Sequence, residues 1–112
     1  MALDSTKLEK LEAAALAWVN QTFDLPMPLL SLPPGQPRNE NCCPIARALN
    51  ENCEGYFEVH LRDIYRYEDD QHLEHDALAS VPTSKEARLF IEAFDEGWLP
   101  HLIEEEVATY AD

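Results

Sequence analysis

Six of the chain's eight prolines lie between residues 24 and 44, and this clustering limits the fold more than any other feature of the sequence. Each proline fixes its own φ and disfavours helix in the residue before it, so we predict that residues 24–44 form an extended connector. The connector also carries five large apolar residues, too many for a free linker: Leu25, Met27, Leu29, Leu30 and Leu32. We therefore expect it to lie across the protein core. A proline-rich ligand for a partner domain is the alternative.

Helix patterns stand on both sides of the connector. Residues 1–23 are predicted to be a helical segment. Within it the helix should begin at Thr6, because Glu9 follows three residues later in the capping-box arrangement. Apolar residues then recur every three or four positions and share one helical face: Leu8, Leu11, Ala15, Trp18 and Val19. Residues 45–52 are expected to form a short helix capped by either Asn41 or Cys43. Pro44 would stand in its first turn, where a missing N–H is harmless.

The middle of the chain carries the strand signals. Apolar and polar residues alternate after Gly55, which predicts a half-buried strand whose apolar face holds Phe57, Val59 and Leu61. Asp63 interrupts the alternation, and we expect the strand to continue past a bulge through residues 64–67. Residues 78–81 then return as its partner, so residues 55–81 form an antiparallel hairpin with an acidic loop. A short helix over residues 72–79 is the alternative.

The closing helix, predicted over residues 83–97, is marked at both ends. Thr83 and Glu86 form a second capping box, and Gly97 is well placed to end the helix. Residues 98–112 follow as a tail. A chain of 112 residues has room for one core, so we predict a single α+β domain. A long N-terminal helix and the C-terminal helix would pack on a short antiparallel β-hairpin, with the connector over the core.

Negative charge is concentrated in the second half of the chain. The net charge is −14, and residues 51–112 hold seventeen acidic residues against four basic ones. Such a surface repels nucleic acid and anionic lipid and attracts basic proteins. The longest apolar run, residues 13–19, is too short to cross a bilayer, and the first residues do not resemble a secretory signal. We expect a cytoplasmic protein whose partner is a basic protein surface, with no direct contact to nucleic acid or membrane.

Several residues of metal-ligand type are present, but their spacing does not match a structural zinc site, and we expect neither a cofactor nor a native metal: Cys42, Cys43, Cys53, His60, His72 and His75. His72 and His75 are the nearest to an exception, since they would share a helix face within the acidic residues 69–76. A solvated acidic loop is the interpretation we favour there. Cys43 near a helix start could be an activated nucleophile, but apolar neighbours favour burial as a structural side chain.

Tyrosines and acidic residues in the hairpin suggest a binding surface. Tyr56, Tyr65 and Tyr67 alternate with charged residues, a composition found both at protein interfaces and at the edge of a core. If these tyrosines form an interface, the nearby carboxylates belong to the same binding surface. The predicted partner-binding residues are Glu58, Tyr65, Tyr67, Glu68, Asp69, Asp70, Glu74 and Asp76.

Two segments carry a resemblance to a known group of proteins. Residues 43–49 read Cys-Pro-Ile-Ala-Arg-Ala-Leu, and residues 90–102 read Phe-Ile-Glu-Ala-Phe-Asp-Glu-Gly-Trp-Leu-Pro-His-Leu. Together they resemble small uncharacterised proteins of actinobacteria and their phages. In that group a Cys-Pro-(Ile/Leu)-Ala turn precedes a hairpin, and the closing helix ends in Phe-Asp-x-Gly-x-x-Pro-x-Leu. The resemblance implies a fold rather than an activity, and a phage origin would favour a role against a host protein.

These observations lead to one functional hypothesis and two alternatives. We expect a non-enzymatic acidic module that binds a basic protein, with a phage-encoded inhibitor or a nucleic-acid mimic as its sharper forms. The first alternative is a small metal-binding or cysteine-dependent enzyme that uses Cys42, Cys43 and residues 69–76. The second is an accessory subunit or homodimer, which would expose an apolar patch.

Overall fold

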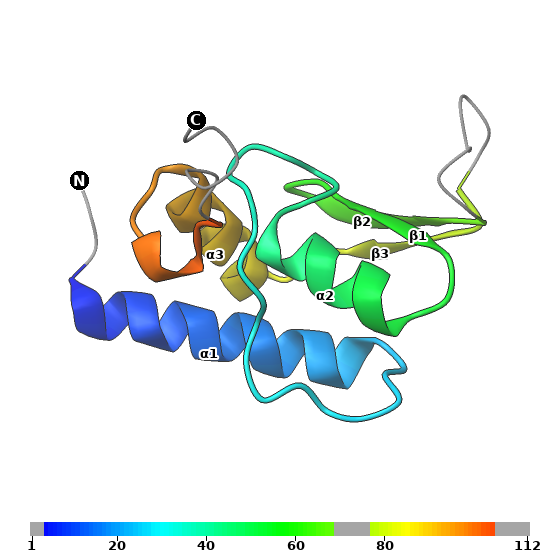
Figure 1. The fold of residues 1–112 in the computed structure, drawn as a ribbon, viewed down its shortest axis with the longest axis horizontal. Coiled ribbons are helices and arrows are strands. Elements are labelled where there is room, and N and C mark those ends of the chain that lie inside the picture. The colour runs from blue at the N-terminus through cyan, green and yellow to red at the C-terminus, as the bar shows by residue number, and fades with distance from the viewer. Residues whose placement is uncertain (1–3, 69–76, 105–112) are drawn as a thin grey trace, which may run out of the picture.

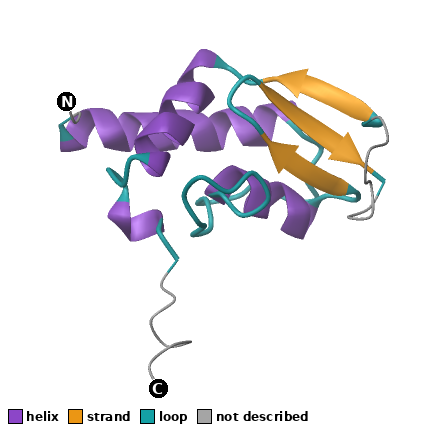
Figure 2. Cartoon of the chain, turned by 90° about the horizontal axis from the view of Figure 1, so that it is seen from above, coloured by secondary structure: helices purple, strands orange, loops and turns teal. Residues whose placement is uncertain are grey.

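The computed structural model describes residues 4–68 and 77–104, and within them the predicted α+β fold is confirmed. The elements are α1 (Ser5–Thr22), α2 (Pro44–Asn52), β1 (Tyr56–Val59), β2 (Asp63–Tyr67), β3 (Ala79–Pro82), α3 (Lys85–Asp95) and the 3₁₀ turn η1 (Pro100–Leu102). In Figure 1, α1 runs along the bottom of the molecule with α2 above it. Figure 2 shows the strands side by side at the end away from the N-terminus. None of the described helices is both long enough and apolar enough to cross a membrane.

The predicted hairpin is a sheet of three antiparallel strands in the order β1-β2-β3. The expected bulge at Asp63 is wrong, because the chain reverses direction after β1 and the main-chain N–H of His60 donates to the Asp63 carbonyl at 2.9 Å. Leu61 therefore lies in a turn, where 40% of it is exposed, and does not belong to the buried face. The return strand is present as β3, and the buried face of the sheet carries Phe57, Val59 and Ile64.

Two of the predicted helix caps are wrong. Asp4 caps α1, accepting a hydrogen bond from the Lys7 N–H at 2.9 Å, because aspartate is as good a cap as threonine and stands two residues earlier. Ser84 caps α3 in place of Thr83. The Thr83 N–H continues the sheet by donating to the Arg62 carbonyl at 2.9 Å, so Thr83 belongs to the strand end.

The other predicted helix ends are confirmed. Cys43 caps α2, and Pro44 is the first residue of that helix. Gly97 follows the end of α3 with a φ of 84°, a left-handed conformation that glycine adopts without steric cost.

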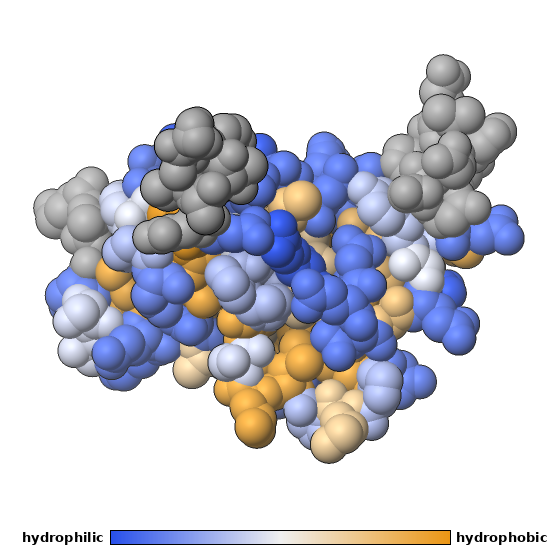
Figure 3. All heavy atoms as spheres, in the orientation of Figure 1, coloured by the Kyte–Doolittle hydropathy of each residue, from blue (hydrophilic) through white to orange (hydrophobic). Residues whose placement is uncertain are grey.

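The connector lies across the core as expected. Leu32 is buried, and Leu25 and Leu29 pack against the core. Met27 and Leu30 face solvent, with 73% and 96% of their surface exposed. Figure 3 shows apolar atoms gathered at the lower centre of the molecule, on the side where the connector passes α1. One side of the connector is therefore core, and the other is an apolar surface.

Asparagine side chains fasten two extended segments to helices. The Asn20 carboxamide in α1 accepts from the Leu29 N–H at 2.8 Å and donates to the Leu29 carbonyl at 3.0 Å. Asn50 in α2 does the same for Phe57 in β1, at 2.8 and 3.1 Å. Each carboxamide thus takes the place of a neighbouring strand, satisfying backbone groups that would otherwise be buried without partners.

The middle of the connector pairs with residues 102–104, at the end of η1 and directly after it. The Gly35 N–H donates to the Leu102 carbonyl and the Gly35 carbonyl accepts from the Glu104 N–H, both at 2.8 Å. The Glu104 carboxylate also receives two hydrogen bonds from the Arg47 guanidinium of α2, at 2.6 and 3.1 Å. Connector, α2 and C-terminal segment are joined at this point.

Gly35 is needed because the backbone at residues 42–44 comes too close for a side chain. A Cβ at position 35 would lie 2.3 Å from the Cys42 carbonyl oxygen and 2.7 Å from the Pro44 nitrogen. Backbone atoms cannot rotate away as a flexible side chain can, so the chain would have to move.

We predict that Gly35→Ala lowers the free energy of unfolding by about 2 kcal/mol, the cost of overpacking a closely packed site. Gly97→Ala is the matched control, because a Cβ there meets no atom within 4 Å and only its positive φ is unfavourable. That change should cost about 1 kcal/mol. Urea denaturation of both variants measures the difference. A smaller loss in Gly35→Ala than in Gly97→Ala would show that the close approach does not constrain the fold.

Candidate functional site

The outer face of the sheet gathers the predicted binding residues that the structure describes. Glu58 stands opposite Tyr65 and Tyr56 opposite Tyr67 in the pairing of β1 with β2, so these four side chains share one face. All four are half-buried, and Glu68 is exposed directly after β2. The remaining predicted residues lie outside the described residues: Asp69, Asp70, Glu74 and Asp76, as well as the weak metal candidates His72 and His75.

Glu40 and His60 also lie on this face, and Glu40 is the member that the sequence did not identify. The His60 Nε2 atom lies 3.2 Å from a Glu58 carboxylate oxygen and 3.8 Å from one of Glu40. Glu40 reaches this position because its carbonyl accepts a hydrogen bond of 2.9 Å from the Val59 N–H. That contact is made by the main chain, so no side-chain pattern in the sequence could have signalled it.

The carboxylates on this face change the acidity of a neighbouring phenol. Burial raises the pKa of Tyr67, and the charge of Glu58, the Tyr65 phenol and the charge of Glu40 raise it further. Negative charge opposes the formation of a tyrosinate anion nearby. The outer face of the sheet is therefore a region of negative potential.

A groove of about 900 Å³ adjoins this face and shares Glu40 with it. It runs between residues 38–40, the end of β1 and α3. Its apolar lining includes Leu61 and Leu89, each 40% exposed, together with Trp98. Four carboxylates and one cation also line it: Glu40, Glu92, Asp95, Glu96 and Arg38. The groove combines an apolar floor with an acidic rim.

Main-chain hydrogen bonds fix the wall of the groove at residues 38–40. Arg38 adopts a φ of 56°, which is unusual for a residue other than glycine, and its N–H donates to the Asp95 carboxylate at 2.8 Å. The Asn39 carbonyl accepts from the Cys42 and Cys43 N–H groups at 3.2 and 3.0 Å. This wall is tied to α3 on one side and to the start of α2 on the other.

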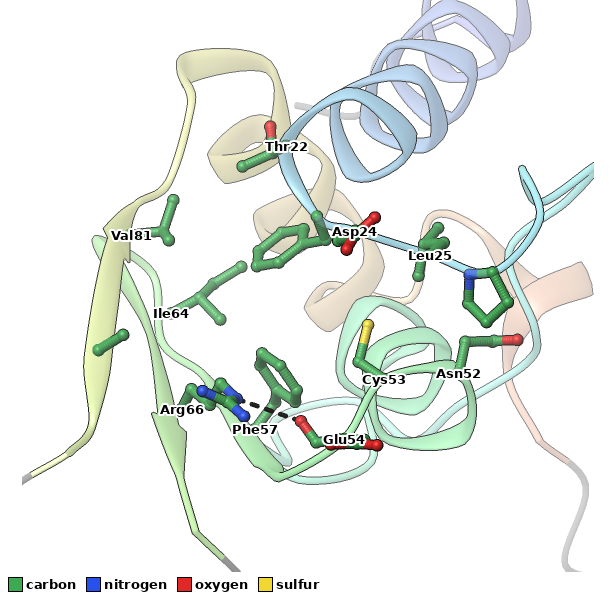
Figure 4. Close-up of a pocket in the computed structure, with 13 residues that line it drawn as sticks. Thr22, Asp24, Leu25, Asn52, Cys53, Glu54, Phe57, Ile64, Arg66 and Val81 are labelled. Carbon is green, nitrogen blue, oxygen red and sulfur yellow. Dashed lines mark hydrogen bonds between the residues drawn. The ribbon is translucent and has the colours of Figure 1, made fainter.

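A second hollow, of about 540 Å³, lies between the inner face of the sheet and the ends of α1 and α2 (Figure 4). Phe57, Ile64 and Val81 line the sheet side. Arg66, at its edge, donates from Nε to the Glu54 carbonyl at 3.1 Å. Cys53 and Asp24 also line the hollow. Burial raises the pKa of the Cys53 thiol and the charge of Asp24 raises it further, which does not favour a thiolate there.

Cys43 is arranged as a structural side chain. The Cys43 sulfur is buried and accepts a hydrogen bond from the Ala46 N–H at 3.4 Å, and burial raises the pKa of this thiol to about 11. The thiol is therefore protonated at neutral pH, which does not favour a thiolate nucleophile. Cys42 and Cys53 are half-buried and, like Cys43, free of disulfides.

No family model, curated protein or solved structure matches this sequence. The resemblance to actinobacterial and phage proteins stays a prediction, and functional arguments rest on the geometry described above.

We predict that Glu58→Gln lowers the pKa of Tyr67, because it removes one of the charges that oppose ionisation of the phenol. In the wild type this raised pKa favours the folded state below the pKa of an unfolded tyrosine, about 10. The contribution is lost as the pH rises through the folded value. Carbon-13 NMR titration of the tyrosine ring measures the shift, with Glu9→Gln on α1 as control. An unchanged Tyr67 titration in Glu58→Gln would mean that the outer face carries no such field.

We also predict an order of thiol reactivity with a disulfide reagent at mildly alkaline pH. Cys42 and Cys53 should react with the folded protein before Cys43, whose sulfur is buried and whose pKa is raised to about 11. In urea all three should react together. Cys43→Ala should remove the slow phase alone. Loss of the fast phase in that variant would contradict the assignment.

Proposed function

We propose that this chain is a non-enzymatic cytoplasmic protein that binds a basic, amphipathic segment of another protein in the groove between α3 and the β1–β2 turn. The observation that carries the proposal is the combination of apolar side chains and carboxylates in one groove. Leu61 and Leu89 offer exposed apolar surface, and the rim offers four carboxylates against one cation. A segment with one apolar face and one cationic face is complementary to both the apolar surface and the carboxylates of the groove.

The placement of the rim carboxylates is unfavourable for the isolated chain. Glu92, Asp95 and Glu96 lie at the C-terminal end of α3, where the helix dipole disfavours negative charge, and the last turn of α3 has no basic residue. Glu92 and Glu96 are also four residues apart, a spacing at which like charges destabilise a helix. Lysine or arginine side chains of a partner would relieve both effects, which supports a cationic ligand here.

A basic protein segment fits the groove better than nucleic-acid mimicry does. A mimic must present carboxylates in rows that approach the charge spacing of DNA, about one per 1.7 Å of axis. Here leucine and tryptophan side chains line the groove together with the carboxylates, so apolar contacts contribute as well as charge. The neighbouring outer face, with Glu58, Tyr65 and Tyr67, extends the same interface through Glu40. If the protein derives from a phage, the partner is a host protein and binding inhibits it.

The test uses a synthetic helical peptide of leucine and lysine, compared with an oligolysine of equal charge. We expect the amphipathic peptide to bind more tightly than oligolysine, and to bind more weakly as salt is raised. Glu92→Lys combined with Glu96→Lys should weaken binding by about tenfold or more, a loss of about 1.4 kcal/mol. Isothermal titration calorimetry measures the affinities.

A control variant of matched charge distinguishes binding in the groove from attraction by the protein's overall negative charge. Glu9→Lys combined with Glu51→Lys changes the net charge equally, at exposed positions on α1 and α2 outside the groove. This pair should leave peptide binding nearly unchanged. Equal losses in both double variants, or equal binding of oligolysine and the amphipathic peptide, would show that the groove is not the binding site.

A further inference from the structure

We propose that Glu40, Glu58 and His60 form a binding site for a divalent metal ion of the zinc class on the outer face of the sheet. One imidazole and two carboxylates converge there, and their candidate ligand atoms all lie within 4.8 Å of one another. Of the residues of metal-ligand type noted in the sequence the site uses His60 alone, and it is separate from the cysteines and from residues 69–76.

The three side chains are held on one scaffold. Glu58 belongs to β1, and His60 follows it two residues later on the same face. The His60 N–H donates to the Asp63 carbonyl at 2.9 Å, and the Val59 N–H holds the Glu40 carbonyl at 2.9 Å. The Tyr65 ring meets the imidazole edge-on, with ring centres 5.3 Å apart. The backbone positions and the ring are thus set before any ion binds, which reduces the cost of forming a site.

The distances match a metal site more closely than a set of hydrogen bonds. Bonds of about 2.0–2.1 Å place two ligand atoms of a tetrahedral zinc site about 3.3–3.4 Å apart. The His60 Nε2 atom lies 3.2 Å from Glu58 and 3.8 Å from Glu40. A hydrogen bond on this nitrogen can serve Glu58, but 3.8 Å is too long for one to Glu40. An ion between the three groups would be reached by both carboxylates after side-chain adjustment, because all three ligand atoms already lie within 4.8 Å of one another.

The donor set selects the class of ion. One imidazole nitrogen and two carboxylate oxygens suit Zn²⁺, whereas Mg²⁺ and Ca²⁺ prefer oxygen ligands alone. Two carboxylates that point at one nitrogen also repel each other, and a dication between them removes that repulsion. Three protein ligands leave a coordination position for water or for a group from a partner.

The experiment titrates Zn²⁺ into the full-length, tag-free protein after treatment with a chelator. Calorimetry should detect the binding of one Zn²⁺ ion per chain at this site, and Mg²⁺ should not compete with Zn²⁺ for the site. His60→Gln, Glu58→Gln and Glu40→Gln should each weaken it by about tenfold or more, because each removes a ligand. Zn²⁺ should also raise the melting temperature of the wild type, and not that of His60→Gln.

Matched controls distinguish this site from other residues that bind metals. His101 also pairs with a carboxylate, at 2.7 Å from Glu12, so His101→Gln removes a comparable exposed pair and should leave the affinity unchanged. A variant with His72→Gln and His75→Gln should retain the site as well. Co²⁺ should show no thiolate charge-transfer band, which would appear if cysteines were ligands. Zn²⁺ binding that survives His60→Gln, or no binding by the wild type, would overturn the proposal.

The proposals of metal binding and of peptide binding can be refuted independently of each other. The variant with Glu92→Lys and Glu96→Lys lacks the acidic rim of α3 but keeps all three metal ligands, so it should bind Zn²⁺ normally. His60→Gln leaves Leu61, Leu89 and the rim in place, so it should still bind the peptide.

Discussion

The pairing of Gly35 with residues 102–104 is the constraint on which the rest of the structure depends. Its two main-chain hydrogen bonds hold the middle of the proline-rich connector at a fixed point, and the Arg47–Glu104 pair ties that point to α2. Residues 38–40 start from this anchor and can therefore reach both α3 and β1. Without it, Glu40 would not be held beside Val59, and neither the groove nor the cluster on the sheet would have its second wall.

Acidity in this protein is placed at particular points rather than spread evenly. Carboxylates crowd the C-terminal end of α3 and the outer face of the sheet, where the helix dipole or neighbouring carboxylates oppose them. Elsewhere a cation relieves the negative charge, as Arg47 does for Glu104. A protein optimised only for stability would place cations at such positions. Stability given up locally is a common property of binding sites, because a ligand restores it.

Local patterns predicted the elements but not the contacts that build the site. Helical periodicity located α1 and α3, and alternation located β1, because these patterns reflect which side faces the core. The same alternation continues through the turn after β1, so it placed Leu61 on the buried face, although that residue contributes to the groove. Glu40 was missed because its position depends on a main-chain hydrogen bond to a residue far along the chain. Caps were misplaced by one or two residues where adjacent polar side chains compete for the same role.

The two asparagines that replace a neighbouring strand also expose the fold to chemical ageing. Asn20 and Asn50 each donate from the amide nitrogen to a carbonyl while the amide oxygen accepts from an N–H. Deamidation would exchange that nitrogen for a carboxylate oxygen and set it against the carbonyl of Leu29 or Phe57, so attraction would become repulsion. In a chain with twenty-two acidic residues, one further negative charge at most other positions would change the net charge only slightly. At these two positions it would loosen the connector from α1, or β1 from α2.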